Sequence, residues 1–367
     1  MLTVRYTFLD SARGIAALIV VIHHYFLEYG NFSFDSTINI VATRFFSDGM
    51  SAVRFFFVLS GFVLSLSLLK SDDKLTPAKY FSFVVSRVFR IMPLYIFVLL
   101  LSILSYFLLY KNLNFVPNKK FFFGTSWSDP HILKNVWREF LLYINLERTY
   151  GFIPQGWSLT YEIINSFFLP FLLIIVRYQK ILSVIFVFIL LKFFQVNEFI
   201  FDFYLGVIIA QNHQIFTFAW LKLSTFWKSI LSFMSISLFA INTILPPYLP
   251  YYFEKFFFSL TSVGSALIIL ILIASPKSQA ILNKKIMYEI GRFSFSIYLT
   301  HILVINALVP YLFTFINTFT LNYNLNLALG LFCTLFISLM ISFVLFYIVE
   351  KPFIKIGKSA LNLFQIR

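Results

Sequence analysis

The chain has 367 residues, of which 60% are hydrophobic and only 12% are charged. Charged residues make up about a quarter of a typical soluble domain, so this composition excludes an ordinary soluble protein, and the mean hydropathy of +0.86 agrees. The single cysteine, Cys333, excludes an internal disulfide and a zinc site built from cysteine pairs, and we expect no bound metal. The formal net charge is +14, but the sequence shows no folded basic face with elements that read bases. We therefore expect no nucleic-acid partner.

Ten apolar stretches are long enough, or nearly long enough, to cross a bilayer as helices. A backbone that faces lipid must satisfy its own hydrogen bonds, which favours helices, and the alternating strands of a membrane barrel are absent. We therefore expect an all-α polytopic membrane protein with about ten transmembrane helices, forming a single domain over residues 1–367. The stretches are 12–29, 51–69, 90–110, 157–176, 181–195, 199–212, 228–245, 256–274, 293–313 and 328–349.

The distribution of basic residues predicts the orientation. With the N-terminus in the cytoplasm, ten spans also return the C-terminus to the cytoplasm, and 19 of the 29 Lys and Arg residues then lie in inside segments. This excess follows the positive-inside rule, and it places basic side chains against anionic membrane lipids. The longest extracytoplasmic loop covers about 111–156, in which residues 137–146 predict a short interfacial helix with Trp137, Phe140, Leu141 and Ile144 on one face.

The first span carries an arginine and a histidine eleven positions apart, Arg13 and His24. Eleven steps of about 100° make three turns plus about 20°, so both side chains share one helix face, roughly 16 Å apart along the axis. Ionisable side chains inside a membrane are costly and usually functional. A histidine that only packs inside the protein is the plain alternative, and the arginine on the same face favours a function.

Three neighbours support this pair. Asp10 lies three residues before Arg13 and can pair with it at the cytoplasmic end. Glu28 lies four residues beyond His24 and can orient the imidazole or raise its basicity. Gly14 allows another helix to approach closely.

Two more arginines, Arg87 and Arg90, open the third span and neighbour each other on the helix surface. Two explanations fit these arginines equally well. They can anchor the span by the positive-inside rule, or they can act as a pair of forks that bind phosphate oxygens. With Arg13 they would form an anion-binding mouth on the inner face.

The fourth span begins with Trp157 and Ser158 and carries Glu162 about one and a half turns inside, where an unpaired carboxylate is expensive. An arginine partner from another helix is one explanation for Glu162, and proton handling or binding of a hydroxylated acceptor is the other. His301 lies nine residues beyond Arg292, near the middle of the ninth span.

Taken together and in this order, these motifs resemble the acyltransferase-3 family of integral membrane acyltransferases. The motif that begins at Trp157 carries a single acidic residue, and this form resembles the branch of exopolysaccharide and O-antigen O-acetyltransferases. We expect no appended hydrolase-like domain. The matching residues are Asp10, Arg13, Gly14, His24, Arg87, Arg90, Trp157, Ser158, Leu159, Glu162, Ser294 to His301, Glu350 and Pro352.

The resemblance implies an O-acyltransferase of the bacterial cytoplasmic membrane. It would take an acyl group, commonly acetyl, from cytoplasmic acetyl-CoA as a co-substrate and transfer it to a hydroxyl of a surface glycan or a lipid-linked glycan precursor. His24 would act as general base or carry the acyl group. The other implied roles are donor binding by Arg13, Arg87 and Arg90, acceptor or proton handling by Glu162 and His301, and support by Asp10, Glu28, Trp157 and Ser158.

Two other functions remain open at this stage. Buried His, Glu and Arg residues also mark proton-coupled transporters and flippases, although the chain shows no inverted repeat. A transporter would move substrate without consuming a thioester, which separates the two hypotheses. The second alternative is a membrane scaffold in a polysaccharide-export complex, in which the ionisable groups are only structural.

Overall fold

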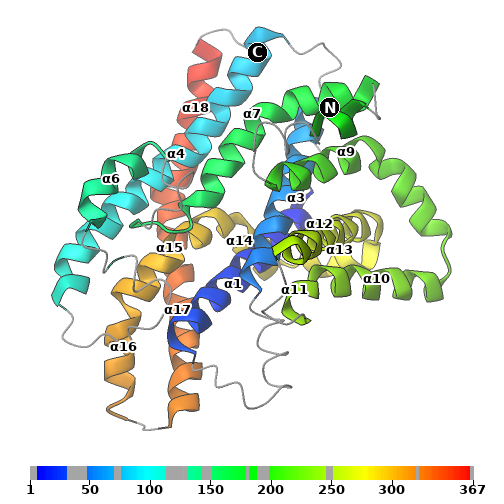
Figure 1. Ribbon diagram of the computed structural model, residues 1–367. Coiled ribbons are helices and arrows are strands. Elements are labelled where there is room, and N and C mark those ends of the chain that lie inside the picture. The colour runs from blue at the N-terminus through cyan, green and yellow to red at the C-terminus, as the bar shows by residue number, and fades with distance from the viewer. Residues whose placement is uncertain are drawn as a thin grey trace. The chain divides into compact units, whose positions relative to one another are not determined.

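The computed structural model describes residues 6–30, 48–69, 76–112, 127, 131–142, 151–178, 182–187, 198–244, 251–319 and 322–363. These residues form helices joined by short turns, and none of them lies in a strand (Figure 1). The chain is therefore an all-α polytopic membrane protein, as its composition predicts. Because each helix satisfies its own backbone, helices suit a chain this apolar.

The helices follow the predicted apolar stretches closely, with shifted ends. In chain order they are α1 (Thr7–Tyr29), α3 (Gly49–Leu69), α4 (Pro77–Leu108), the 3-10 turn η1 (Tyr110–Asn112), α6 (Ile132–Phe140), α7 (Gly156–Tyr178), α9 (Phe199–Lys222), α10 (Thr225–Phe239), α11 (Ile241–Ile244), α12 (Tyr251–Ala274), α13 (Pro276–Leu282), α14 (Lys285–Arg292), α15 (Ser294–Ala307), α16 (Val309–Ile316), α17 (Tyr323–Leu345), the π-helical turn η3 (Phe346–Glu350) and α18 (Lys351–Leu363).

Five of these helical segments are long and apolar enough to cross a membrane, and a sixth qualifies if α14 and α15 form one bent span. The five are Gly49–Leu69, Pro77–Leu108, Gly156–Tyr178, Phe256–Ala274 and Tyr323–Leu361. The helices α1 and α9 are long enough but carry several ionisable side chains, and most of the stretch 181–195 lies outside the described residues. The total of ten spans and the positions of the termini stay predictions.

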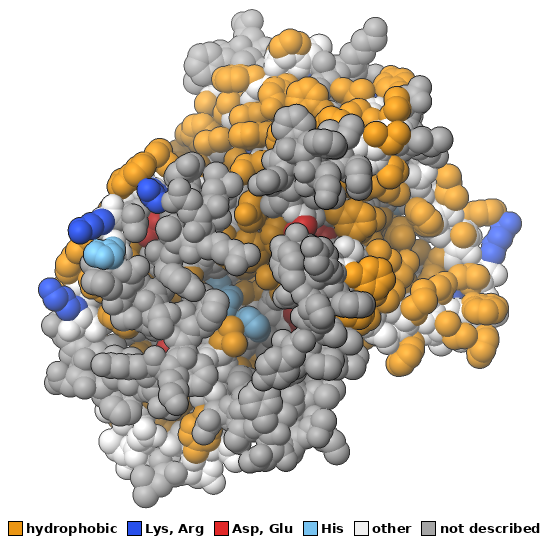
Figure 2. Space-filling view, viewed as in Figure 1, with side chains coloured by type: hydrophobic (Ala, Val, Ile, Leu, Met, Phe, Trp, Pro, Cys, Tyr) orange, Lys and Arg blue, Asp and Glu red, His pale blue; other side chains and the backbone are white. Residues whose placement is uncertain are grey.

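Large hydrophobic side chains cover much of the described surface, as the orange areas of Figure 2 show. Phe107, Phe332 and Phe336 are among those that point outward. A soluble monomer rarely exposes apolar patches of this extent, whereas lipid replaces water around a membrane protein.

The described helices group into two compact units. Unit 1 contains Met1–Ala16, Val41–Tyr80 and Tyr161–Gly291, and unit 2 contains Ala17–Ile40, Phe81–Thr160 and Arg292–Arg367. The chain passes between the units within α1, α4 and α7, and again before the last residue of α14, so each of these helices contributes residues to both units.

Unit 1 is built around α3 and α9, with α12 packed against both. The two helices approach so closely that a Cβ atom added at Gly61 would lie 2.4 Å from the carbonyl oxygen of Phe203, and one at Gly206 would lie 2.3 Å from that of Val58. Only glycine permits this backbone contact, which is typical of small-residue helix pairs in membranes. Gly14 of α1 meets the backbone of Gly291 in the same way, at 2.7 Å, which confirms the predicted close approach.

Unit 2 is built around α15, which packs against α16 and α17. Figure 1 shows α4 and α18 side by side, and a Cβ atom at Gly357 of α18 would lie 2.7 Å from Cβ of Phe89. Local signals mark the starts of two helices: the Asn322 side chain accepts a hydrogen bond from the N–H of Leu325 at the start of α17, and Pro310 lies in the first turn of α16.

The predicted interfacial helix at 137–146 is displaced. The structure has α6 over Ile132–Phe140, and Leu142 then adopts a left-handed φ of 53°, which cannot continue a right-handed helix. Leu133, Trp137 and Leu141 point outward at steps of four residues and form the exposed apolar face. Ile144 lies outside the described residues.

Candidate active site

Two histidines that are 277 positions apart in the sequence meet inside unit 2. Nδ1 of His24, on α1, lies 2.8 Å from Nε2 of His301, on α15. Their rings are nearly parallel, with an interplanar angle of 20° and centroids 4.9 Å apart. One imidazole must donate and the other must accept, and two neutral rings satisfy that requirement. The structure thus joins two of the residues that the sequence singled out.

The two imidazoles differ in their surroundings. His301 is fully buried, and its Nδ1 atom has no hydrogen-bond partner among the described residues, whereas His24 is only partly buried. If His24 donates through Nδ1, its Nε2 atom is the unprotonated ring nitrogen, which is the atom that can act as a base. In this arrangement His301 acts through His24 and holds its tautomer.

An aromatic cluster holds the C-terminal half of α1 in place. Tyr25 and Tyr29 pack with Phe313 in a buried core, where the rings of Tyr29 and Phe313 stack with centroids 4.7 Å apart. The Tyr29 hydroxyl donates to the carbonyl of Ile305, and the Tyr25 hydroxyl donates to that of Leu327, each at 2.9 Å. These bonds tie α1 to α15 and α17 and therefore fix the position of His24 relative to His301.

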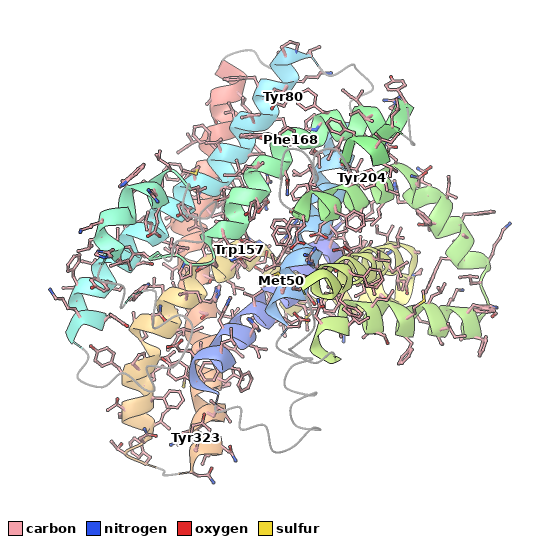
Figure 3. All side chains as sticks on the ribbon, viewed as in Figure 1. Met50, Tyr80, Trp157, Phe168, Tyr204 and Tyr323 are labelled. Carbon is pink, nitrogen blue, oxygen red and sulfur yellow. The ribbon has the colours of Figure 1, made fainter. Side chains whose placement is uncertain are left out.

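The start of α7 reaches α15 through Ser158 and Gln155. The Ser158 hydroxyl lies 2.6 Å from that of Tyr298, and the Gln155 amide donates to the carbonyl of Leu299 at 2.8 Å. Tyr298 and His301 lie on the same helix, with ring centroids 5.8 Å apart. Ser158 therefore has a defined contact next to the histidine pair, while the neighbouring Trp157, labelled in Figure 3, is only partly buried.

Glu139 of α6 holds the segment that leads into α7. Its carboxylate oxygens accept hydrogen bonds from the N–H groups of Phe152 and Ile153, at 2.8 and 3.0 Å, and it is almost fully buried. Burial raises the pKa of Glu139 to about 7, although the two N–H groups favour its charged form. Gly151 passes so close that a Cβ atom there would lie 2.5 Å from the Glu139 carboxyl carbon.

Buried hydroxyls line the contact between α15 and the last helices. Ser296 donates to Oε2 of Glu350 at 2.7 Å, and the hydroxyls of Thr300 and Ser342 lie 3.1 Å apart. Glu350 lies in the π-helical turn η3, a feature found often at functional sites. The contact explains why an acidic residue is tolerated at the end of this long helix.

The three arginines that are predicted to bind phosphate differ in the solvent exposure of their side chains. Arg13 pairs with Asp10 at 3.5 Å, as the spacing predicts, and both side chains are partly exposed. Arg87 is 7% exposed, whereas Arg90, three residues later on α4, is exposed. At 1.5 Å per residue the 32 residues of α4 measure about 48 Å, more than the roughly 30 Å of hydrocarbon.

The predicted roles of the two glutamates remain untested. Glu162 is partly buried on α7 in unit 1, where its carbonyl accepts a hydrogen bond from the Ser166 hydroxyl. Glu28 is buried on α1 in unit 2. Orientation of His24 by Glu28 stays a prediction.

Sequence reasoning missed two buried ionisable residues, Arg54 and Asp202. Both lie inside predicted spans, and both are almost completely buried in unit 1. The rule that drew attention to Arg13 and His24, that ionisable groups in a membrane span are rarely idle, applies equally to them.

A family model described as an acyltransferase domain, that of the acyltransferase-3 family, matches residues 6–347. Neither the curated proteins nor the solved structures contain a significant match. The family match covers most of the chain, including every helix from α1 to α17, and it agrees with the motifs and the helical fold. The chain therefore belongs to the acyltransferase-3 family of integral membrane acyltransferases.

Proposed function

We propose that this membrane acyltransferase moves an acyl group, preferably acetyl, from cytoplasmic acyl-CoA to a hydroxyl of a surface glycan or its lipid-linked precursor, at the bacterial cytoplasmic membrane. The observation that carries the proposal is the hydrogen-bonded pair of His24 and His301. A partly accessible imidazole, held by a second and fully buried imidazole, is suited to move a proton to and from a hydroxyl.

In the proposed reaction, Nε2 of His24 removes the proton of the acceptor hydroxyl while the hydroxyl oxygen attacks the thioester carbonyl carbon. The new C–O bond forms and the C–S bond breaks. The imidazolium returns its proton to the departing thiolate, which leaves as the thiol of CoA. His301 accepts the hydrogen bond from Nδ1 of His24 and stabilises the imidazolium, as the second partner of a catalytic histidine commonly does.

The donor would bind through its phosphates. Arg87, Arg90 and Arg13 supply guanidinium groups, which pair with phosphate oxygens through two parallel hydrogen bonds. We assign the largest share of the interaction with the donor phosphates to Arg87, because a buried cation in water-poor surroundings interacts with an anion more strongly than an exposed one. Glu162 would bind the acceptor or transfer its proton.

The first experiment measures formation of the CoA thiol from acetyl-CoA by purified protein in lipid nanodiscs, for the wild type and for His24→Ala. We expect a loss of at least about 100-fold in kcat, the usual share of a general base. His213→Ala is the matched control, because His213 is also partly buried on a helix, but its ring bonds the carbonyl of Ala210, in unit 1. Full activity of His24→Ala would remove this residue from the mechanism.

The same assay separates the alternatives. A protein that transports its substrate without acyl transfer releases no thiol in any variant. If His24 carries the acyl group instead of acting as a base, incubation with radioactive acetyl-CoA alone labels the wild type and leaves His24→Ala unlabelled.

A further inference from the structure

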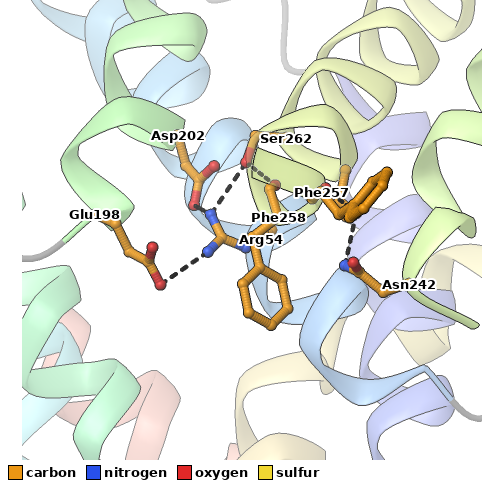
Figure 4. Close-up of polar contacts among 8 residues, drawn as sticks. Arg54, Glu198, Asp202, Asn242, Phe257, Phe258 and Ser262 are labelled. Atoms are coloured by element: carbon orange, nitrogen blue, oxygen red, sulfur yellow. Dashed lines mark hydrogen bonds and ion pairs between the residues drawn. The ribbon is translucent and has the colours of Figure 1, made fainter. Parts of the chain in front are cut away.

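A buried cation lies among three helices of unit 1, apart from the residues used above. Arg54 of α3 is 2% exposed, and its guanidinium faces α9 and α12 (Figure 4). An arginine within an apolar helix is expensive unless its donors are satisfied. Its surroundings therefore show which groups the protein has gathered around it.

Two phenylalanines pack against the guanidinium of Arg54. Its central carbon lies 5.0 Å from the ring centroid of Phe199 and 4.9 Å from that of Phe258. Both distances are typical of cation–π contacts. The two rings pack against the guanidinium, and its Nη1 group donates to polar partners.

Those donors meet two carboxylates and a hydroxyl. Nη1 lies 3.4 Å from Oδ2 of Asp202 and 3.2 Å from Oγ of Ser262, while Nη2 lies 3.1 Å from Oε1 of Glu198. One cation thus faces two acidic groups. A further anion would be repelled, so a phosphate, a sulfate or an acidic sugar is a poor ligand for this cluster.

Two donors and one acceptor of this cluster make no hydrogen bond. Nε and Nη2 of Arg54 and Oδ1 of Asp202 are buried and have no hydrogen-bond partner among the described residues, although Nη2 forms an ion pair with Glu198. Leaving such atoms unpaired is unfavourable, and native proteins avoid it. A hydroxyl group can accept a hydrogen bond from an N–H or donate one to a carboxylate, so an uncharged hydroxyl is a suitable partner for either kind of atom.

The cluster lies near one end of the helices. Glu198, directly before α9, is 40% exposed, whereas Arg54 and Asp202 behind it are buried. Arg54 and Asp202 lie within the first two turns of α3 and α9, which run parallel, so both helices begin at the same end of unit 1. In the predicted orientation this is the extracytoplasmic end.

From this geometry we infer that Arg54, Asp202 and Ser262, with Glu198 at the rim, form a binding site for an uncharged sugar, held through one of its hydroxyls. That this sugar belongs to the acceptor glycan rests on the proposed function, whereas binding itself does not. An ion-pair network that only joins the three helices is the competing explanation, and it predicts no ligand.

The test is thermal unfolding of the purified full chain in nanodiscs, without acyl donor, over a concentration series up to about 100 mM of glucose, galactose or N-acetylglucosamine, with glucuronate as the anionic counterpart. For at least one uncharged sugar we expect a saturable rise of the midpoint by about 1–3 °C. Glucuronate should give no saturable rise. A rise that is linear in concentration and equal for all sugars is the general solute effect and would overturn the inference, as would no rise.

Two variants and a control test where the sugar binds. Arg54→Lys keeps the charge that the two carboxylates need but removes the Nε–H donor, so the saturable shift should disappear. Ser262→Ala removes the hydroxyl that accepts from Nη1 of Arg54 and should weaken sugar binding about tenfold. This variant provides the test if Arg54→Lys fails to fold. Ser235→Ala is the control, because this buried serine also donates to a carbonyl of its own helix but bonds no arginine in the part of the chain that the structure describes.

The outcomes separate this inference from the proposed function. Saturable sugar binding that the Arg54 and Ser262 variants lose, in a protein that releases no thiol from acetyl-CoA, would support the site and contradict the acyl transfer. Thiol release without saturable sugar binding would support the acyl transfer and contradict the sugar site. An equal saturable shift in the wild type and both variants would place the sugar elsewhere and overturn the inference.

Discussion

His24 and His301 show how one side chain can define the chemistry of another. His24 is the partly accessible member of the pair, and His301 lies behind it, fully buried and joined to it at 2.8 Å. A buried partner that selects the tautomer of a reactive imidazole changes the rate of the chemical step more than substrate binding. His301 is therefore a positioning residue in the proposed mechanism.

His301→Gln tests that role. We expect kcat to fall about 10- to 100-fold, the range typical for loss of a positioning partner, while the KM for acetyl-CoA stays unchanged. The pH profile of kcat should also shift, because the partner that stabilises the imidazolium is gone. Thr314→Ser, a mild change on α16 away from the pair, is the control. Unchanged kcat and an unchanged profile would make His301 a packing residue.

Arg87 and Arg90 allow a second comparison of single residues. If Arg87 binds the phosphates of the donor, Arg87→Ala should raise the KM for acetyl-CoA about 10- to 100-fold, in keeping with the loss of a charge-assisted hydrogen bond. The exposed Arg90 should have a smaller effect. Equal KM values for the wild type and Arg87→Ala would return this residue to membrane anchoring.

The sequence identified individual site residues unevenly. His24 and His301 were recognisable because they are ionisable groups inside apolar stretches, but no spacing rule shows that residues 277 positions apart touch. Arg54 and Asp202 obey the same rule and were missed, since neither forms a pair with regular spacing on one helix. Their relationship exists only between helices, where sequence periodicity carries no information.

At the level of helices, the contact of α3 with α9 depends on two glycines. Replacing a helical glycine by alanine normally stabilises a helix by about 1 kcal/mol. At Gly206, however, the new Cβ atom would lie 2.3 Å from a carbonyl oxygen of the other helix, and backbone atoms have no freedom to move aside. The steric term therefore outweighs the gain in helix propensity.

Gly206→Ala should accordingly lower the thermal unfolding midpoint of the purified protein by several degrees, equivalent to about 1–3 kcal/mol of overpacking. Gly156→Ala is the matched control, because its nearest neighbour would be a Tyr95 ring atom at 3.4 Å, an ordinary contact. A midpoint for Gly206→Ala at or above that of the wild type would show that the two helices can separate without loss.

The short helix α6 gives unit 2 a response to pH. Burial raises the pKa of Glu139 from 4.5 to about 7, so the folded protein binds this proton more tightly than the unfolded chain. The resulting stability is fully present below about pH 4.5 and is lost as the pH rises through about 7. The loss is on the order of 1–3 kcal/mol.

We therefore expect the unfolding midpoint of the wild type to fall between pH 5 and pH 8, and that of Glu139→Gln to fall less. Gln retains one acceptor for the N–H groups of Phe152 and Ile153 and cannot titrate. Glu289→Gln on α14, an acidic residue outside the apolar spans in unit 1, controls for a general effect of charge. Parallel slopes for all three proteins would contradict the assignment.

Helix ends were less predictable than helices. Apolar runs of about 20 residues locate helices well, because both the bilayer thickness and the hydrogen-bond requirement act along the whole run. The end of α6 depends instead on the backbone angle of one residue, Leu142, and the start of α4 lies well before its apolar run begins. Neither feature has a hydropathy signal.

At the scale of the whole molecule, the two units are interleaved along the chain. Each unit draws on three separate segments, and α1, α4 and α7 belong to both. Composition and periodicity predicted the class of protein and the order of its helices, and the family match agrees. They carried no signal for this division, because it follows from which helices touch and not from any change in composition along the chain.

The separation of the two histidines also has a consequence for biosynthesis. A ribosome that adds 5–20 residues per second needs roughly 15–55 s to proceed from His24 to His301, 277 positions later. During that interval α1 has already been synthesised, whereas α15 and α17, which later accept the hydrogen bonds of Tyr29 and Tyr25, have not. The nascent protein therefore has no assembled histidine pair until its last quarter arrives, and any premature stop before α15 yields a polypeptide without this centre.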